Sequence, residues 1–129
     1  KGERFAEAPA NPHTIASGLR VPRAVGDFMI LDAVRASGGR AIACPEEQII
    51  PWMRRASALE GISLCPESAA CLGVLERALL DGHIERHETI VLFNTGAAQK
   101  YVETLQAELP RISRVNPDWA AIERSSMRV

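Results

Sequence analysis

Lysine is nearly absent from this chain. Of its 15 basic residues only Lys1 and Lys100 are lysines, and the others are arginines. Because Schiff-base chemistry needs a primary amine, few positions could form a covalent link to a carbonyl group. The 16 acidic residues bring the net charge to −1, so the sequence has no basic face that would attract phosphate backbones. We therefore expect no nucleic-acid partner.

Long apolar runs and glycine-rich phosphate loops are also missing. No stretch approaches the ~20 apolar residues that span a bilayer, so we expect no membrane association. Neither G-x-G-x-x-G nor G-x-x-x-x-G-K-[ST] occurs, which argues against ATP and NAD as ligands. With 129 residues, 47% of them hydrophobic and 24% charged, the chain has the composition of one globular domain.

Cysteine and histidine are too few and too irregularly spaced to predict a metal site. Cys44, Cys65 and Cys71 match neither a zinc framework nor a C-x-x-C redox pair, so we expect buried free thiols in a cytoplasmic protein. His83 and His87 are four residues apart, but the zinc-protease motif needs glutamate directly after its first histidine. We expect both histidines in a surface loop.

Helical and strand-like segments alternate along the chain. Apolar spacing, together with proline at helix starts and glycine at helix ends, predicts helices over 24–37, 46–60, 66–80 and 99–109. Short β-compatible segments occupy 40–44, 62–64 and 89–93. This alternation predicts an α/β fold, a layered sheet with mainly parallel strands and flanking helices. We expect an irregular lead-in over 1–13, the α/β unit over 14–109 and a polar C-terminal tail over 110–129.

The segment TIVLFNTGAAQK, over 89–100, is the most informative part of the sequence. Its apolar run is typical of a buried parallel strand, and open α/β sheets bind ligands beyond the carboxyl ends of such strands. Thr95 lies where a cofactor could be held, or it caps the following helix. Earlier in the chain, Ser68 and Cys71 follow Glu67 at a helix start that favours anions, where capping is the simpler interpretation than catalysis.

Four motifs together resemble the carboxy-terminal part of threonine synthase. They are TIASGLRVP over 14–22, EGISLCPESAA over 60–70, DGHI over 81–84 and VLFNTGAAQKY over 91–101, in that order and spacing. The resemblance implies part of the large domain of a fold-type II pyridoxal-phosphate enzyme, similar to the tryptophan synthase beta subunit. It also implies pyridoxal 5'-phosphate as cofactor and O-phosphohomoserine as the small-molecule substrate, which is converted with water to threonine and phosphate.

The resemblance also implies roles for individual residues. Thr95 matches the family threonine that forms a hydrogen bond at the pyridine nitrogen of the cofactor. We expect Asn94 to shape the turn and Gly96 to let the backbone approach the ring, because glycine has no Cβ. Glu67 and Ser68 match a helix start that faces the same cleft, although the family commonly has glycine at the position of Ser68.

The family's Schiff-base lysine and glycine-rich phosphate loop lie in amino-terminal regions that have no counterpart in this sequence. Lys1 has no such context, and Lys100 matches a lysine just after the N-T-G turn that is not the Schiff-base residue. We therefore expect no catalytic residue in this chain, and we expect the chain alone to be inactive as one wall of a longer enzyme's site.

Two alternatives stay open. Threonine deaminase, diaminopropionate ammonia-lyase and similar lyases share the fold, although several of them have serine where this chain has Thr95. A non-catalytic α/β binding module would keep the fold without the chemistry. In either case an incomplete sheet leaves strand edges and an apolar face uncovered, which predicts self-association into a homo-oligomer.

Overall fold

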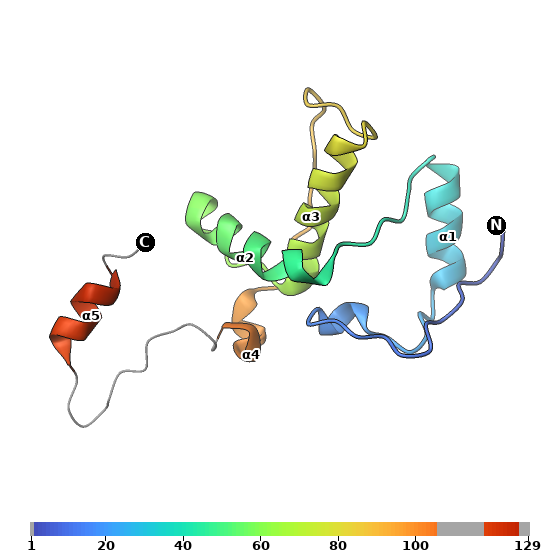
Figure 1. Cartoon of the computed structure of the whole chain (residues 1–129). Coiled ribbons are helices and arrows are strands. Elements are labelled where there is room, and N and C mark those ends of the chain that lie inside the picture. Colours follow the sequence, from blue (N-terminus) through green and yellow to red (C-terminus); the bar gives the residue numbers. More distant parts are fainter. Residues whose placement is uncertain (1, 106–117, 127–129) are drawn as a thin grey trace.

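The computed structural model describes residues 2–105 and 118–126, and these residues are mainly helical (Figure 1). Three long helices carry the fold: α1 (Asp27–Ala36), α2 (Glu46–Glu60) and α3 (Pro66–Leu80). The shorter elements are η1 (Ser17–Leu19), η2 (Ala98–Lys100), α4 (Val102–Leu105) and α5 (Trp119–Ser126). Among these described residues, no helix is long and apolar enough to cross a membrane.

Local sequence signals set the bounds of the long helices. α2 follows Pro45 and ends at Gly61, which takes the left-handed conformation at φ 65° that glycine adopts without strain. α3 starts with Pro66 in its first turn, where the missing N–H costs no helical hydrogen bond. The three helices expected over 24–37, 46–60 and 66–80 are confirmed.

Two expectations for the end of the chain were wrong or only partly tested. The helix expected over 99–109 is interrupted at Tyr101, which separates η2 from α4; residues 106–109 lie outside the described residues. The tail expected over 110–129 contains α5, whose polar and apolar residues we did not interpret as helical. Its residues 110–117 and 127–129 also lie outside the described part.

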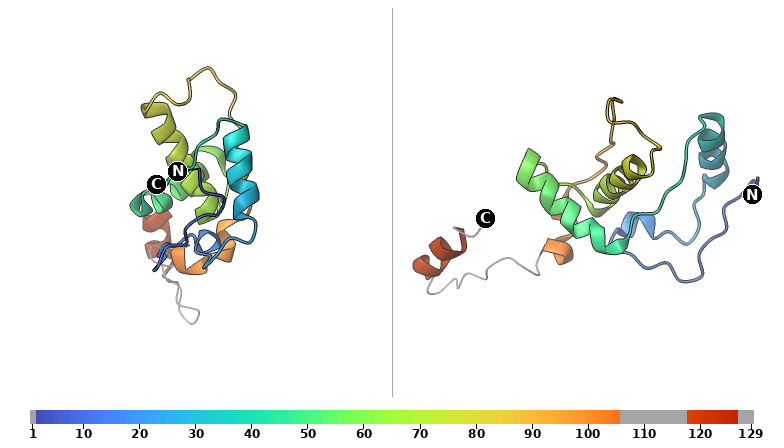
Figure 2. Two further views of the ribbon diagram at one scale, coloured as in Figure 1. Left: turned by 90° about the vertical axis from the view of Figure 1, so that its right-hand side faces the viewer. Right: turned by 45° about the horizontal axis from the view of Figure 1, so that its top comes forward.

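The core lies where α2 crosses α3 (Figure 2). Ile49 and Met53 of α2 pack with small residues of α3, and both helices approach closely because the facing residues have short side chains. At Gly73 a Cβ atom would lie 2.5 Å from Cys44 Sγ, so a larger residue there would force the Cys44 side chain to move. The buried members of this core are Ala16, Ile49, Met53, Ala69, Ala70 and Ala98.

The segments expected as strands are present as connections without strand geometry in the described residues. Residues 40–44, 62–64 and 89–93 form no β-ladder there. A strand is defined by its neighbours, and an isolated pair of strands is marginal in water. One backbone bond does join two of the regions: the N–H of Cys65 donates to the carbonyl oxygen of Gly96 at 3.2 Å. The parallel sheet therefore stays a prediction.

The thiols are free, and their burial differs from what we expected. Cys65 is buried and Cys44 is half-buried, whereas Cys71 is exposed. Cys71 is exposed because it lies on the face of α3 that turns away from the crossing with α2 and toward an open cleft, which it lines. The expectation of three buried thiols was thus wrong for Cys71.

Candidate cofactor site

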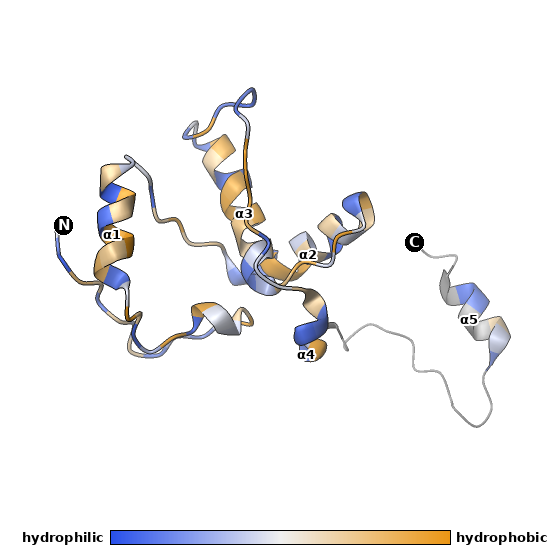
Figure 3. Cartoon of the chain, turned by 180° about the vertical axis from the view of Figure 1, so that it is seen from behind, coloured by the Kyte–Doolittle hydropathy of each residue, from blue (hydrophilic) through white to orange (hydrophobic). Residues whose placement is uncertain are grey.

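A cleft of about 660 Å³ runs along α3 and contains three of the expected site residues. Its walls are one face of α3, residues 90–93 with Thr95, and residues of the connection over 38–42. The segment over 90–93 runs beside α3, and both are largely apolar (Figure 3). Glu67, Ser68 and Thr95 line it at the start of α3. The volume falls within the ~300–1,000 Å³ of small-molecule sites.

Ser68 holds the backbone of the N-T-G segment, which we define as Asn94 to Gly96. Its hydroxyl is 1% exposed and accepts a hydrogen bond from the N–H of Thr95 at 3.2 Å. The capping role expected for Ser68 was wrong, because the residue that caps α3 is Cys65 and Ser68 lies inside the first turn. The capping alternative for Thr95 was wrong as well, since Ala97 occupies the N-cap position of η2 and makes no side-chain cap hydrogen bond.

Cys65 packs against both Ser68 and Thr95. Its Sγ atom lies 3.2 Å from Ser68 Oγ and 3.9 Å from Thr95 Oγ1. A Cβ atom at Gly96 would lie 3.3 Å from the Cβ of Cys65, so glycine allows this close approach. Thr95 is therefore fixed through its backbone, while its side chain is exposed at the cleft.

Glu67 joins three segments that are distant in sequence. Its Oε1 atom accepts hydrogen bonds from the N–H of Gly18 and from the hydroxyl of Tyr101, each at 2.8 Å. At Gly18 a Cβ atom would lie only 2.9 Å from that oxygen. The Oε2 atom is buried and has no hydrogen-bond partner among the described residues.

These contacts keep Glu67 ionised. Burial is the largest influence and raises its pKa, but hydrogen bonds from its own N–H, Gly18, Tyr101 and Cys65 together outweigh burial, so the pKa of this carboxyl lies below its usual value. The same bond to Glu67 raises the pKa of the Tyr101 phenol, together with burial of the ring. Tyr101 thus stays a neutral donor to a charged acceptor.

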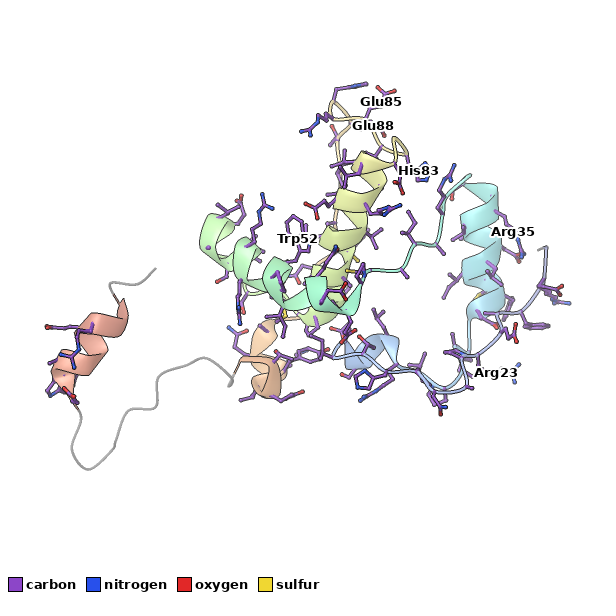
Figure 4. The ribbon with its side chains drawn as sticks, viewed as in Figure 1. Arg23, Arg35, Trp52, His83, Glu85 and Glu88 are labelled. Carbon is purple, nitrogen blue, oxygen red and sulfur yellow. The ribbon has the colours of Figure 1, made fainter. Side chains whose placement is uncertain are left out.

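At its opposite end the cleft is lined by two polar side chains, those of Arg40 and His83. Arg40 Nη1 lies 3.3 Å from Nε2 of His83, and both side chains are exposed. Figure 4 shows His83 just beyond the end of α3. His83 and His87 follow the end of α3, in the loop that their sequence context indicated. Within the described part of the chain, no three histidine, cysteine, aspartate or glutamate side chains are grouped to hold a metal ion.

Three contributors to the site were not predicted from the sequence, and one predicted site residue, Asn94, does not line the cleft among the described residues. Cys65, Tyr101 and the backbone of Gly18 all contact the residues expected there. All three fall within the quoted motifs, but their contacts join positions more than 25 residues apart, which a local pattern does not reveal. Asn94 is exposed and is not among the described residues that line the cleft.

Comparison with known proteins identifies the family. A family model described as pyridoxal-phosphate dependent enzyme matches residues 1–96. The chain belongs to this pyridoxal-phosphate-dependent enzyme family. Threonine synthase of Methanosarcina acetivorans is 34% identical over 110 residues, which are 84% of this chain and 27% of that protein. Threonine synthase of Methanocaldococcus jannaschii is 38% identical over 90 residues, 70% of this chain and 22% of that protein.

The mycobacterial enzymes give a similar picture. Threonine synthase of Mycobacterium bovis is 30% identical over 116 residues, which cover 90% of this chain and 32% of that protein. The chain thus spans about a quarter to a third of the length of these curated relatives. The resemblance to threonine synthase that the motifs indicated is confirmed.

The residues at the start of α3 suit pyridoxal phosphate, the cofactor of this family. The exposed hydroxyl of Thr95 lines a largely apolar cleft, and it can donate to or accept from a ring nitrogen. Glu67, whose buried Oε2 atom has no hydrogen-bond partner among the described residues, lines the same end of the cleft. The cofactor supplies an electron sink for carbanions when it is bound.

Proposed function

We propose that this chain is the carboxy-terminal part of a threonine synthase-like enzyme and that it supplies the pyridine-nitrogen side of the cofactor site. The observation that supports this most strongly is the position of Thr95. Its backbone is tied to Ser68 and its hydroxyl is exposed at a cleft that Glu67 also lines. The reaction would convert O-phosphohomoserine and water to threonine and phosphate.

In this proposal Thr95 acts as a neutral hydrogen-bond partner of the ring nitrogen. A hydroxyl, unlike a carboxylate, does not favour protonation of that nitrogen, because it brings no negative charge. Ser68 and Cys65 hold Thr95 in place, and Gly96 keeps the backbone close to Cys65. The chain alone would turn over no substrate, since the family's Schiff-base lysine has no counterpart among its motifs.

The part of the enzyme that this chain lacks would complete both the sheet and the site. The curated relatives are about three times as long as this chain and match it over only 22–32% of their own length. We expect the segments over 40–44, 62–64 and 89–93 to become strands when neighbouring strands pair with them. Three free thiols fit the reducing environment of the cytoplasm, where we place the enzyme.

A hybrid enzyme tests the proposed function. This chain would replace the matching carboxy-terminal part of the Methanocaldococcus jannaschii threonine synthase, and phosphate release from O-phosphohomoserine would be measured. We expect activity in the hybrid, loss of about tenfold or more with Thr95→Val, and retention with Thr95→Ser, because serine keeps the hydroxyl.

The same hybrid separates the alternatives. Formation of 2-oxobutyrate from threonine without phosphate release would favour a deaminase-like lyase. A hybrid that folds and binds the cofactor, yet has equal activity with threonine or valine at position 95, would contradict the role of Thr95. A folded hybrid that binds no pyridoxal phosphate would favour the non-catalytic binding module.

A further inference from the structure

One carboxylate oxygen joins the start of α3 to two segments that are distant in sequence. The Oε1 atom of Glu67, in the first turn of α3, accepts from Gly18 in η1 and from Tyr101 directly after η2. Both bonds are 2.8 Å long, and both donors are separated from Glu67 by more than 30 residues of sequence. Such long-range bonds to a charged acceptor are stronger than neutral ones.

The N-T-G segment is consequently attached to α3 on two sides. Before η2, the N–H of Thr95 donates to Ser68 Oγ and the carbonyl of Gly96 accepts from the N–H of Cys65, each at 3.2 Å. After η2, Tyr101 returns to Glu67. Between these attachments Ala98 is buried in the core, so the loop from Thr95 to Tyr101 is held against the start of α3.

We propose that Tyr101 and Gly18 are positioning residues, which act through the shared oxygen of Glu67 to fix where the N-T-G segment presents the hydroxyl of Thr95. Tyr101 holds the far side of the loop, and Gly18 brings η1 to the same carboxylate because it has no side chain. Only the consequence for the cofactor rests on the proposed function; the positioning itself concerns contacts within this chain.

The geometry explains why two attachments are needed. The bonds at Thr95 and Gly96 hold the start of the loop to α3. Tyr101, six residues beyond Thr95, attaches the end of the loop to the same helix. A hydroxyl that is placed within a fraction of an ångström needs supporting contacts of this kind.

The first test uses the fact that Tyr101 is the chain's only tyrosine. Ultraviolet absorbance at alkaline pH therefore reports the ionisation of this residue alone. In the 129-residue chain we expect the pKa of Tyr101 to lie above its ordinary value of 10.0 and to fall toward it in Glu67→Gln. An identical titration of the two proteins would show that the bond is not formed in solution and would overturn the proposal.

The second test measures positioning directly, without any cofactor. Amide hydrogen exchange at Thr95 should become about threefold to tenfold faster in Tyr101→Phe, which removes only the hydroxyl. Ser63→Ala is the matched control, because it removes the bond from Ser63 Oγ to Gln99 Oε1 at 3.0 Å, which joins the same two segments without Glu67. We expect no change at Thr95 in this control.

Circular dichroism separates positioning from unfolding. If Tyr101→Phe retains its helix content and Thr95 exchanges as in the unmodified chain, Tyr101 has no positioning role and the proposal fails. If both variants accelerate exchange equally, the loop is held by general packing, and the proposal fails as well. Neither result depends on the Thr95→Val hybrid, so failure here and failure of the proposed function are distinguishable.

Discussion

The first turn of α3 and the segment that leads into Asn94 differ sharply in how their side chains are covered. Cys65 and Ser68 are 2% and 1% exposed, and both contact the N-T-G segment. Val91 and Phe93, only a few residues before that segment, are 76% and 81% exposed. Polar contacts within the chain therefore fix the N-T-G segment. The apolar side chains just before it are not buried by other described residues.

This difference separates two requirements of the site. The hydrogen bonds that hold Thr95 come from residues of this chain and need no contact with another protein segment. The apolar run before it, which we expected to be a buried strand, is exposed because no β-ladder forms over 89–93 in the described residues. An exposed apolar stretch of this kind is typical of a surface that packs against another protein surface.

The largest expected effect comes from the core beneath the first turn. Ile49 is 2% exposed and packs between α2 and α3, so Ile49→Ala should lower the free energy of unfolding by about 2–5 kcal/mol. Urea unfolding followed by circular dichroism measures this loss. Val25→Ala, at a side chain that is 95% exposed, is the control and should change the value by no more than about 0.5 kcal/mol. Similar losses in both variants would refute the proposed core.

A smaller effect is expected from acid at Glu67. Because its folded-state pKa lies below the usual value of 4.5, Glu67 contributes stability above that pH, and this stability is lost as the pH falls through the lower folded-state pKa. Urea unfolding at neutral pH and between about pH 3 and 4 should show a larger acid loss in the unmodified chain than in Glu67→Gln. Parallel losses would mean that other carboxyl groups carry the acid sensitivity.

Local signals predicted the helices, whereas long-range contacts limited the prediction of the site. Pro66 and Gly61 mark helix ends by their own backbone chemistry, so the bounds of α2 and α3 could be predicted from the sequence. A strand depends on neighbours that need not be near in sequence, and the segment over 89–93 gives no local sign of whether a partner is present. Its apolar pattern therefore indicated burial that the described residues do not provide.

The site shows the same division. Glu67, Ser68 and Thr95, which the resemblance placed at one cofactor site, line the same cleft, and their role there stays a prediction. It did not reveal that Ser68 bonds to a backbone 27 residues away, or that Tyr101 reaches Glu67 across 34 residues. These bonds depend on how α3 and η2 pack, and Ala98 of η2 is buried in the core beside residues of α3 that are distant in sequence.

Substitutions in the exposed apolar segment over 89–93 should have the smallest effect on stability and the clearest effect on self-association. The double variant Val91→Ser with Phe93→Ser should change the free energy of unfolding by no more than about 0.5 kcal/mol, because neither side chain is buried. We expect the chain to self-associate through this apolar surface, and the double variant to shift sedimentation toward the monomer. Val25→Ser removes an apolar side chain elsewhere that is even more exposed, at 95%, and should leave association unchanged. A chain that sediments as a monomer at high concentration before any substitution would show that the exposed run does not drive association, and the contrast with the first turn of α3 would then concern packing alone.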